Sequence, residues 1–494
     1  MFNLLNVLFA FIVVGILLLI ARLIKSKVRL FQTLYLPESI IAGEIALLLG
    51  SGALGAISVA TGASPDSYLA GGLFPSEMRA VWSQSPGVFI NIVFAALFLG
   101  EHIPNPRDVW RKTAPQVAFG QAIAWGQYVI GILITLLILT PVFGANPLTG
   151  ALIEIGFEGG HGTAGGMADT LTDLGFAEGG DLALGLATVG ILSGIIFGTL
   201  LAHWGRKKGY IQSEPTEVPD GDAQFQETAP VETSAVLAKR SRLMRNFLID
   251  PLSLNFGFTG LAIAIGWLIL QVMTLIESAT WGRNGLELIG AVPLFPMALI
   301  GGIIIQVVMK RLDLDVLVIR RLQERIAGVA LDLLVVTALA SINLAVLGAN
   351  LGIFLTLSIV GITWNVLAFI YLAPKILPVY WFERGIGDMG QSMGVTATGI
   401  LLIRMVDPEN RTGAFESFAY KQLFFEPIVG GGLFTAAAPA LLARFGPIPV
   451  LLGTAALLIF WLAFGIINCK RTMKQLQSER SAAAEADLTT TAAR

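Results

Sequence analysis

The sequence predicts an all-α membrane protein that crosses the bilayer many times. Of its 494 residues, 55% are hydrophobic and only 13% are charged, whereas a soluble globular protein carries about 25% charged residues. The apolar residues form separate runs of about 20 residues, and each run is long enough to cross a hydrocarbon core of about 30 Å as a helix. This composition excludes a soluble enzyme.

The apolar runs form two sets with a polar segment between them. The polar segment, at about 205–250, is rich in Pro, Glu, Asp and Thr and buries too little apolar surface to fold, so we interpret it as a linker. No basic residues precede the first run and no small-residue cleavage site follows it, so we interpret it as a membrane helix rather than a signal peptide. The runs lie at about 3–24, 38–60, 86–100, 114–140 and 182–204 in the first set, and at 252–273, 291–309, 326–347, 350–373, 424–442 and 447–468 in the second.

Two further apolar stretches, at about 147–175 and 378–405, are interrupted by glycines and by polar or charged residues. Neither stretch has the continuous apolar character of a membrane helix. Each of them follows the fourth run of its set. We therefore predict that neither stretch crosses the membrane. The first enters from outside and returns there, and the second enters from the cytoplasm and returns there.

Lysine and arginine in short loops indicate the orientation, because cytoplasmic loops carry an excess of both residues. The loop at 61–85 has one arginine and the loop after the fourth run has no charge, so both are expected outside the cell, together with the amino terminus. The linker and the carboxyl terminus are expected in the cytoplasm. The basic residues that mark cytoplasmic ends are Arg22, Lys25, Lys27, Arg29, Arg107, Arg111, Lys112, Arg206, Lys207, Lys208, Lys310, Arg311, Arg320, Arg321, Arg325, Lys470, Arg471 and Lys474.

This orientation makes the two sets inverted repeats of one another, and a local similarity supports the same conclusion. Gly87–Asn91 (GVFIN) aligns with Gly328–Asp332 (GVALD), each in the third run of its set. Two inverted five-helix repeats, each with a broken hydrophobic element, are typical of secondary transporters, which bind their cargo between the repeats. The predicted organisation is a first repeat at 1–205 with a re-entrant glycine-rich hairpin at 147–175, a cytoplasmic linker at 206–250, a second repeat at 251–442 with a re-entrant hairpin at 378–405, an extra C-terminal membrane helix at 443–469 and a disordered cytoplasmic tail at 470–494.

The first broken stretch contains Glu158–Thr163 (EGGHGT). Its glycines, Gly159, Gly160 and Gly162, are too numerous for a stable helix interior, so the chain is expected to turn there. Glycine permits positive φ and close approach of the backbone to a ligand, and a turn at membrane depth leaves N–H and C=O groups that need a partner. A cation suits the carbonyl groups, and a carboxylate suits the N–H groups.

The second broken stretch, Glu383–Thr398, follows the same logic with Gly387 and Gly390, and Asp388 is its acid. Carboxylates inside a membrane are costly and usually functional, so Glu158, Asp169 and Asp388 are candidate cargo or ion ligands. The alternative for each of them is a pairing with Arg384, Arg404 or the backbone.

Two polar residues related by the repeat, Asn91 and Asp332, lie inside otherwise apolar runs and are candidate sodium ligands or interhelical hydrogen-bonding groups. For Asn91 we favour the second role. His161 has no second histidine nearby in the sequence, so we favour a structural role for it. Gln121 and Trp125, four residues apart, are expected on one helix face, and Glu44 and Glu426 are expected near helix starts.

Several kinds of chemistry lack the necessary residues. The single cysteine, Cys469, excludes a disulfide framework and an iron–sulfur cluster, and the absence of an HExxH motif excludes a zinc protease of that type. No phosphate-binding or dinucleotide motif is present, and a net charge of −2 provides no basic field for nucleic acid. We expect no cofactor, and an ion gradient as the energy source.

The sequence at Glu158–Thr163 resembles the sodium/glutamate symporter family, in which each half carries a glycine-rich re-entrant loop. The resemblance covers most of residues 1–442, including Pro37–Glu38 and the five-plus-five inverted plan. It departs from the family in Gly387–Gly390 (GDMG), which is less uniformly glycine, and in the additional span at 447–468. The residues that take the substrate and ion role by this resemblance are Gly159, Gly160, His161, Gly162 and Thr163 in the first loop, and Gly387, Asp388, Met389, Gly390, Thr396 and Thr398 in the second. Glu158, Gln391 and Ser392, in the same two stretches, are further candidates for substrate or ion binding.

The resemblance implies sodium-coupled uptake of L-glutamate by a homodimer in the plasma membrane, with sodium as the coupling ion and the substrate held where the two loops meet. The sequence leaves open a sodium-coupled carrier of another amino acid or organic anion, or a cation antiporter. A channel is disfavoured because no continuous polar stripe runs along several helices. An enzyme is disfavoured because no nucleophile and base are positioned together.

Overall fold

The computed structural model describes residues 3–33, 36–64, 67–101, 106–211, 239–240, 250–284 and 289–492. These residues form helices and turns and contain no strand. The predicted linker at 206–250 lies almost entirely outside the described residues. Only its first residues, which end the helix Gly179–Lys208, and a few others are described.

Seven helical segments are long and apolar enough to cross a membrane. They match the predicted runs at 3–24, 38–60, 114–140, 182–204, 252–273, 350–373 and 447–468. These segments are Leu4–Lys27, Glu38–Ala60, Thr113–Phe143, Gly179–Lys208, Pro251–Ala279, Leu351–Ile376 and Pro447–Gln475. The predicted runs at 86–100, 291–309 and 326–347 are also helical, in α5 (Ser76–Ala96), α13 (Phe295–Arg311) and α14 (Arg320–Ala340), but are shorter or more polar.

The expectation of one span at 424–442 is wrong. The helix α18 (Ala414–Phe425) ends there and α19 (Leu433–Phe445) begins after three consecutive glycines. Gly430 and Gly431 have φ values of 71° and 98°, which glycine adopts readily and other residues rarely adopt. Because glycine-rich breaks are also predicted at 147–175 and 378–405, we call Gly430–Gly431 the third glycine turn.

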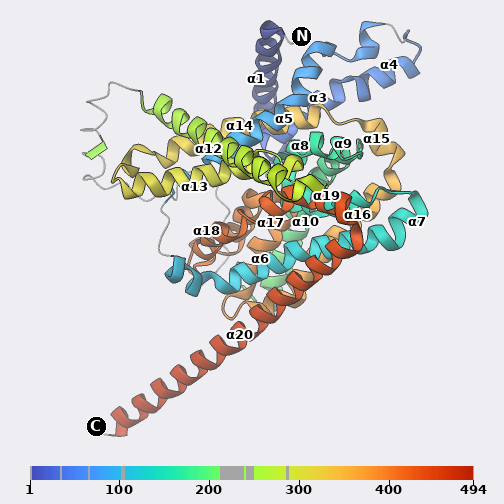
Figure 1. Cartoon of the computed structure of the whole chain (residues 1–494). Helices are drawn as coiled ribbons and strands as arrows, with labels where there is room; N and C mark the ends of the chain where they lie inside the picture. The colour runs from blue at the N-terminus through green and yellow to red at the C-terminus, as the bar shows by residue number, and fades with distance from the viewer. Residues whose placement is uncertain are drawn as a thin grey trace.

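One group of helices packs around α5 and α14 (Figure 1). It consists of α1 (Leu4–Lys27), α3 (Glu38–Leu49), α5, α12 (Pro251–Ala279), α13 and α14. Glycine brings α12 and α13 into close contact, because a Cβ atom on Gly301 would lie 2.1 Å from the carbonyl oxygen of Ala262. Close contact through small residues is a common means of helix association in membranes. Large apolar side chains such as Leu268 and Leu275 of α12 are exposed, as expected for a surface facing lipid.

A second group packs around α6 (Pro106–Ile134) and α10 (Gly179–Lys208). It includes α16 (Leu351–Ile376), α17 (Trp381–Val406), α18 and α20 (Pro447–Ala492), and the long α20 runs along α6 and extends beyond the rest of the molecule (Figure 1). The tail at 470–494, expected to be disordered, is helical as far as Ala492, the last residue described. Its alanine and glutamate residues are good helix formers.

The two groups meet at α8 (Gly160–Gly166), which packs on α10 and also on α5 and α14. Glycines permit this contact. A Cβ atom on Gly165 would lie 2.8 Å from Cβ of Pro86 in α5 and 3.4 Å from Cβ of Ala338 in α14. The first broken stretch therefore lies between the two groups of helices.

Candidate functional site

The first broken stretch consists of short helical segments rather than one helix. A 3₁₀ turn (Pro147–Ala151) and a π-helical turn (Glu154–Glu158) come before α8 and α9 (Ala168–Asp173). The break occurs at Gly160, whose φ is 65°. Segments on both sides of the break contact α10: a Cβ atom on Gly156 would touch Ala183 and Leu186, and Nε2 of His161 lies 3.0 Å from Oγ1 of Thr188. The predicted break is present at Gly160, whereas Gly162, also expected in the turn, lies inside α8.

The second break lies within α17, at Gly394 and Val395. Val395 has a φ of 63°, which is uncommon for a β-branched residue. The two parts of α17 lie against one another, since a Cβ atom on Gly390 would be 3.0 Å from Cα of Gly399. Nine residues of continuous helix would separate those positions by about 13.5 Å. The chain therefore reverses direction at the break.

The two breaks are in direct contact. A Cβ atom added to Gly160 would lie 2.2 Å from Cγ1 of Val395. Helix α10 passes beside both of them, because a Cβ atom on Gly190 would lie 2.2 Å from the carbonyl oxygen of Met393. Residues more than 200 positions apart in the sequence thus form one region, which we call the junction.

Glu158 is buried at the junction, with 3% of its surface exposed. Among the described residues, none makes a hydrogen bond of good geometry with either carboxylate oxygen. The ammonium group of Lys421 and the hydroxyl group of Ser392 act favourably on its charge. Oγ1 of Thr163, which is also buried, has no hydrogen-bond partner in the described part of the chain.

Glu154, one helical turn earlier, has a complete set of donors. The hydroxyl group of Tyr128 donates to Oε2 at 2.5 Å, while the N–H of Gly430 and the hydroxyl group of Thr435 donate to Oε1 at 2.9 and 2.7 Å. These bonds join the first broken stretch to α6 and to the third glycine turn. A buried carboxylate with three donors is well satisfied.

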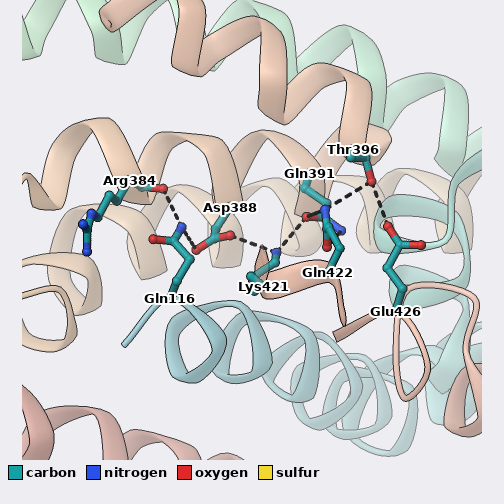
Figure 2. Close-up of polar contacts among 8 residues, drawn as sticks. All are labelled: Gln116, Arg384, Asp388, Gln391, Thr396, Lys421, Gln422 and Glu426. Atoms are coloured by element: carbon teal, nitrogen blue, oxygen red, sulfur yellow. Dashed lines mark hydrogen bonds and ion pairs between the residues drawn. The ribbon is translucent and has the colours of Figure 1, made fainter. Parts of the chain in front are cut away.

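Asp388 forms a buried ion pair with Lys421 of α18 (Figure 2). Nζ of Lys421 lies 2.9 Å from Oδ1 of Asp388, and the two side chains are 1% and 0% exposed. Nε2 of Gln116 donates to Oδ2 of Asp388 at 2.7 Å and to the carbonyl oxygen of Arg384 at 3.0 Å. The ammonium group also lies 4.1 Å from the ring centre of Phe425. Asp388 therefore pairs with Lys421 and not with either arginine we considered.

Hydrogen bonds continue from this ion pair to the second break (Figure 2). Lys421 donates to Oε1 of Gln391 at 2.7 Å, and Gln422 donates to the same oxygen at 2.9 Å. Thr396, directly after the break, donates to Oε1 of Glu426 at 3.1 Å. Glu426 follows the end of α18, so the expectation that it starts a helix is wrong.

The family model for sodium/glutamate symporters matches residues 111–377, which is more than half of the chain. The chain belongs to this family. Membership makes it a membrane transporter of the sodium-coupled symport class rather than an enzyme. The match includes the first broken stretch and ends before α17, so Asp388, Val395 and Lys421 lie outside it. No curated protein matches the chain.

Several of the residues predicted for this symporter's site lie at or beside the junction. Ser392 is buried, and its carbonyl oxygen accepts from Nε2 of Gln127 at 2.7 Å. Thr398 donates to the carbonyl oxygen of Gly394 at 2.5 Å. Gly159 packs against Thr163, and Gly162 packs against Ile90. Gly387 and Gly390 are helical and pack against the second part of α17. Met389 is fully buried in the core.

Other candidates lie elsewhere. Asn91 donates to the carbonyl oxygen of Gly87 at 2.7 Å, which lies in its own helix, so this hydrogen bond is not the interhelical one we expected. Asp332 is exposed on α14 and interacts with Ser39 rather than with the junction. The expectation that Asp169 is buried is wrong, because it is exposed at the surface of α9. Trp125 donates to Gln121 at 2.7 Å, as expected for residues on one face.

Sequence reasoning missed Lys421, Gln116, Glu154 and the third glycine turn. Lys421 lies three residues before the apolar run at 424–442, so it appeared to flank a span. The run Gly430–Gly432 could have indicated it, because three consecutive glycines do not form the interior of a stable helix. A helix predicted to end before these glycines would have included Lys421 rather than leaving it outside a span.

Proposed function

We propose that the protein carries L-glutamate into the cell together with sodium by alternating access, and that both are bound at the junction of the two breaks. The observation that supports this most directly is the contact between Gly160 and Val395 beside the unpaired, buried carboxylate of Glu158. Interrupted helices that meet at membrane depth provide backbone groups for ions and carboxylates. The choice of glutamate rests on family membership.

The packing of the helices supports the proposed inverted repeats. Helices α3 and α13 are the second helices of the two repeats, and α5 and α14 are the third. In the first group, α3 packs on α14 and α13 packs on α5, so the second helix of each repeat contacts the third helix of the other, as a twofold axis between the repeats requires. Helices α5 and α14 also pack on each other, and they carry the two aligned segments at Gly87 and Gly328. In this proposal 147–175 and 378–405 are re-entrant hairpins, and movement between the two groups at α8 exposes the junction to each side in turn. The homodimer is carried over from the resemblance.

Glutamate uptake into proteoliposomes is expected to require external sodium. At neutral pH the substrate has a net charge of −1, and the junction already contains carboxylates, so binding in a medium of low dielectric constant needs added cations. Replacing sodium with choline at a fixed proton gradient should lower the initial rate of radiolabelled glutamate uptake to that of protein-free liposomes. Undiminished uptake in choline would contradict sodium coupling. Competition by unlabelled dicarboxylates and neutral amino acids distinguishes glutamate from the alternative cargoes, and sodium efflux driven by an opposing cation would indicate an antiporter.

Cysteine labelling tests the proposed orientation in the plasma membrane. In a background with Cys469 replaced by serine, Ser64→Cys should react with an impermeant maleimide in intact cells. Ser213→Cys, in the linker after Gly205–Lys208, should react only after permeabilisation, because basic residues are retained on the cytoplasmic side. Labelling of both positions from the same side would contradict the inverted arrangement.

A further inference from the structure

The buried carboxylates at the junction differ in how well they are compensated. Asp388 has the ammonium group of Lys421 and the amide of Gln116. Glu154 accepts three hydrogen bonds, and Glu426 accepts one from Thr396. Glu158 has no well-formed hydrogen bond to either oxygen within the described residues. An ionised carboxylate without a hydrogen bond is unfavourable inside a membrane protein. The ammonium group of Lys421 acts on the charge of Glu158 but is already paired with Asp388, so a second cation is expected beside Glu158 during the transport cycle.

The surroundings of Glu158 provide a second oxygen that needs a partner. Oγ1 of Thr163 is buried and unpaired in the described part of the chain, and both side chains face the third glycine turn. A Cβ atom on Gly431 would lie 2.6 Å from Oγ1 of Thr163, and one on Gly430 would lie 3.6 Å from Cγ of Glu158. Both side chains therefore lie against the third glycine turn, and at Gly431 a Cβ atom would leave no room for the Thr163 hydroxyl.

We propose that Glu158 and Thr163, with the backbone of the third glycine turn, bind the coupling sodium ion, and that Asp388 is the fixed counter-charge of Lys421 rather than a sodium ligand. Hard cations prefer oxygen ligands, and the carboxylate of Glu158 and the hydroxyl of Thr163 provide two kinds of them. Among the described residues no three His, Cys, Asp or Glu side chains form a cluster that could hold a metal ion, so Glu158 is the single carboxylate of the proposed site. This inference rests on the proposed function and deepens it by assigning the ion.

The test is sodium binding to the purified full-length protein, measured without transport. Thermal unfolding followed by scanning fluorimetry is recorded over a sodium titration, with choline chloride keeping ionic strength constant, and binding of radioactive sodium is measured in parallel. The wild type should be stabilised by sodium. Glu158→Gln should weaken the apparent sodium affinity by about 10-fold or more, which corresponds to at least about 1.4 kcal/mol. Asp388→Asn should have a lower melting temperature without sodium, but sodium should raise that temperature with the same apparent affinity as in the wild type.

Thr163 provides a second and milder variant if Glu158→Gln does not fold. Thr163→Val removes the hydroxyl at nearly constant volume and should also weaken sodium binding, whereas Thr163→Ser should restore it. Wild-type sodium affinity in Glu158→Gln or in Thr163→Val would overturn the assignment, and so would loss of the sodium response in Asp388→Asn alone. The assignment would also be overturned if the wild type took up glutamate with sodium but its thermal stability depended on pH and not on sodium. The ligand of Glu158 would then be a proton. A wild-type protein with neither sodium binding nor sodium-dependent uptake would instead refute the proposed function.

Discussion

Substitution of Gly160 by valine is expected to reduce sodium-dependent glutamate uptake by about 100-fold or more while much of the protein remains folded. The reason is the position of the residue at the contact between the two breaks. Its φ of 65° is unfavourable for a β-branched residue, at a cost of about 1–3 kcal/mol, and its Cβ atom would lie 2.2 Å from Cγ1 of Val395. Displacement of a binding element by about 1 Å is enough to cause a loss of this size. Initial uptake rates normalised to the amount of reconstituted protein measure the effect.

Two matched variants show whether the contact is the cause. Gly160→Ala is expected to be impaired because its Cβ atom already meets Val395, and the additional change Val395→Gly should restore part of the activity by removing both the clash and the positive φ of a branched residue. Gly257→Ala is the control, since a Cβ atom on this glycine of α12 has no neighbour within 4 Å. Wild-type uptake by Gly160→Val would show that the junction is not part of the transport path.

Replacement of Lys421 by methionine is expected to lower the free energy of unfolding by about 3–5 kcal/mol, the usual cost of leaving one partner of a buried ion pair without the other. Lys421 and Asp388 are 1% and 0% exposed, so water does not compensate for the lost charge. Methionine keeps the length of the chain, and the side chain fits closely against α6, where a Cβ atom on Gly120 would lie 3.1 Å from Cδ of Lys421. Thermal unfolding in detergent and the yield of monodisperse protein measure the effect.

The double variant Lys421→Met with Asp388→Asn should be more stable than Lys421→Met alone, because it removes the uncompensated charge. Lys375→Met provides the control, since Lys375 is exposed in the last turn of α16. A change below about 1 kcal/mol in Lys421→Met would be typical of an exposed ion pair and would contradict the burial of this one.

The sequence predicted the class of the protein and the places where the chain is interrupted. Apolar runs of the length of a bilayer determine membrane helices wherever they occur, and seven of the predicted runs are long apolar helices in the structure. Glycines inside a hydrophobic stretch likewise predict a break from local properties alone, which is why the turn at Gly160 could be predicted. The second break was placed less well, because Gly387 and Gly390 are helical and serve close packing, while the reversal occurs at Gly394 and Val395.

The partners of the buried charges were decided by tertiary structure. Asp388 has arginines near it in the sequence, yet it pairs with Lys421, which reaches it from another helix. Glu158 and Glu154 are one helical turn apart and of the same chemical type, but three donors from α6, the third glycine turn and α19 surround only Glu154. Local sequence carries information about backbone conformation and burial, because these depend on neighbouring residues. The compensation of a buried charge depends on which distant segments pack against it, and that was determined only by the way the helices assemble.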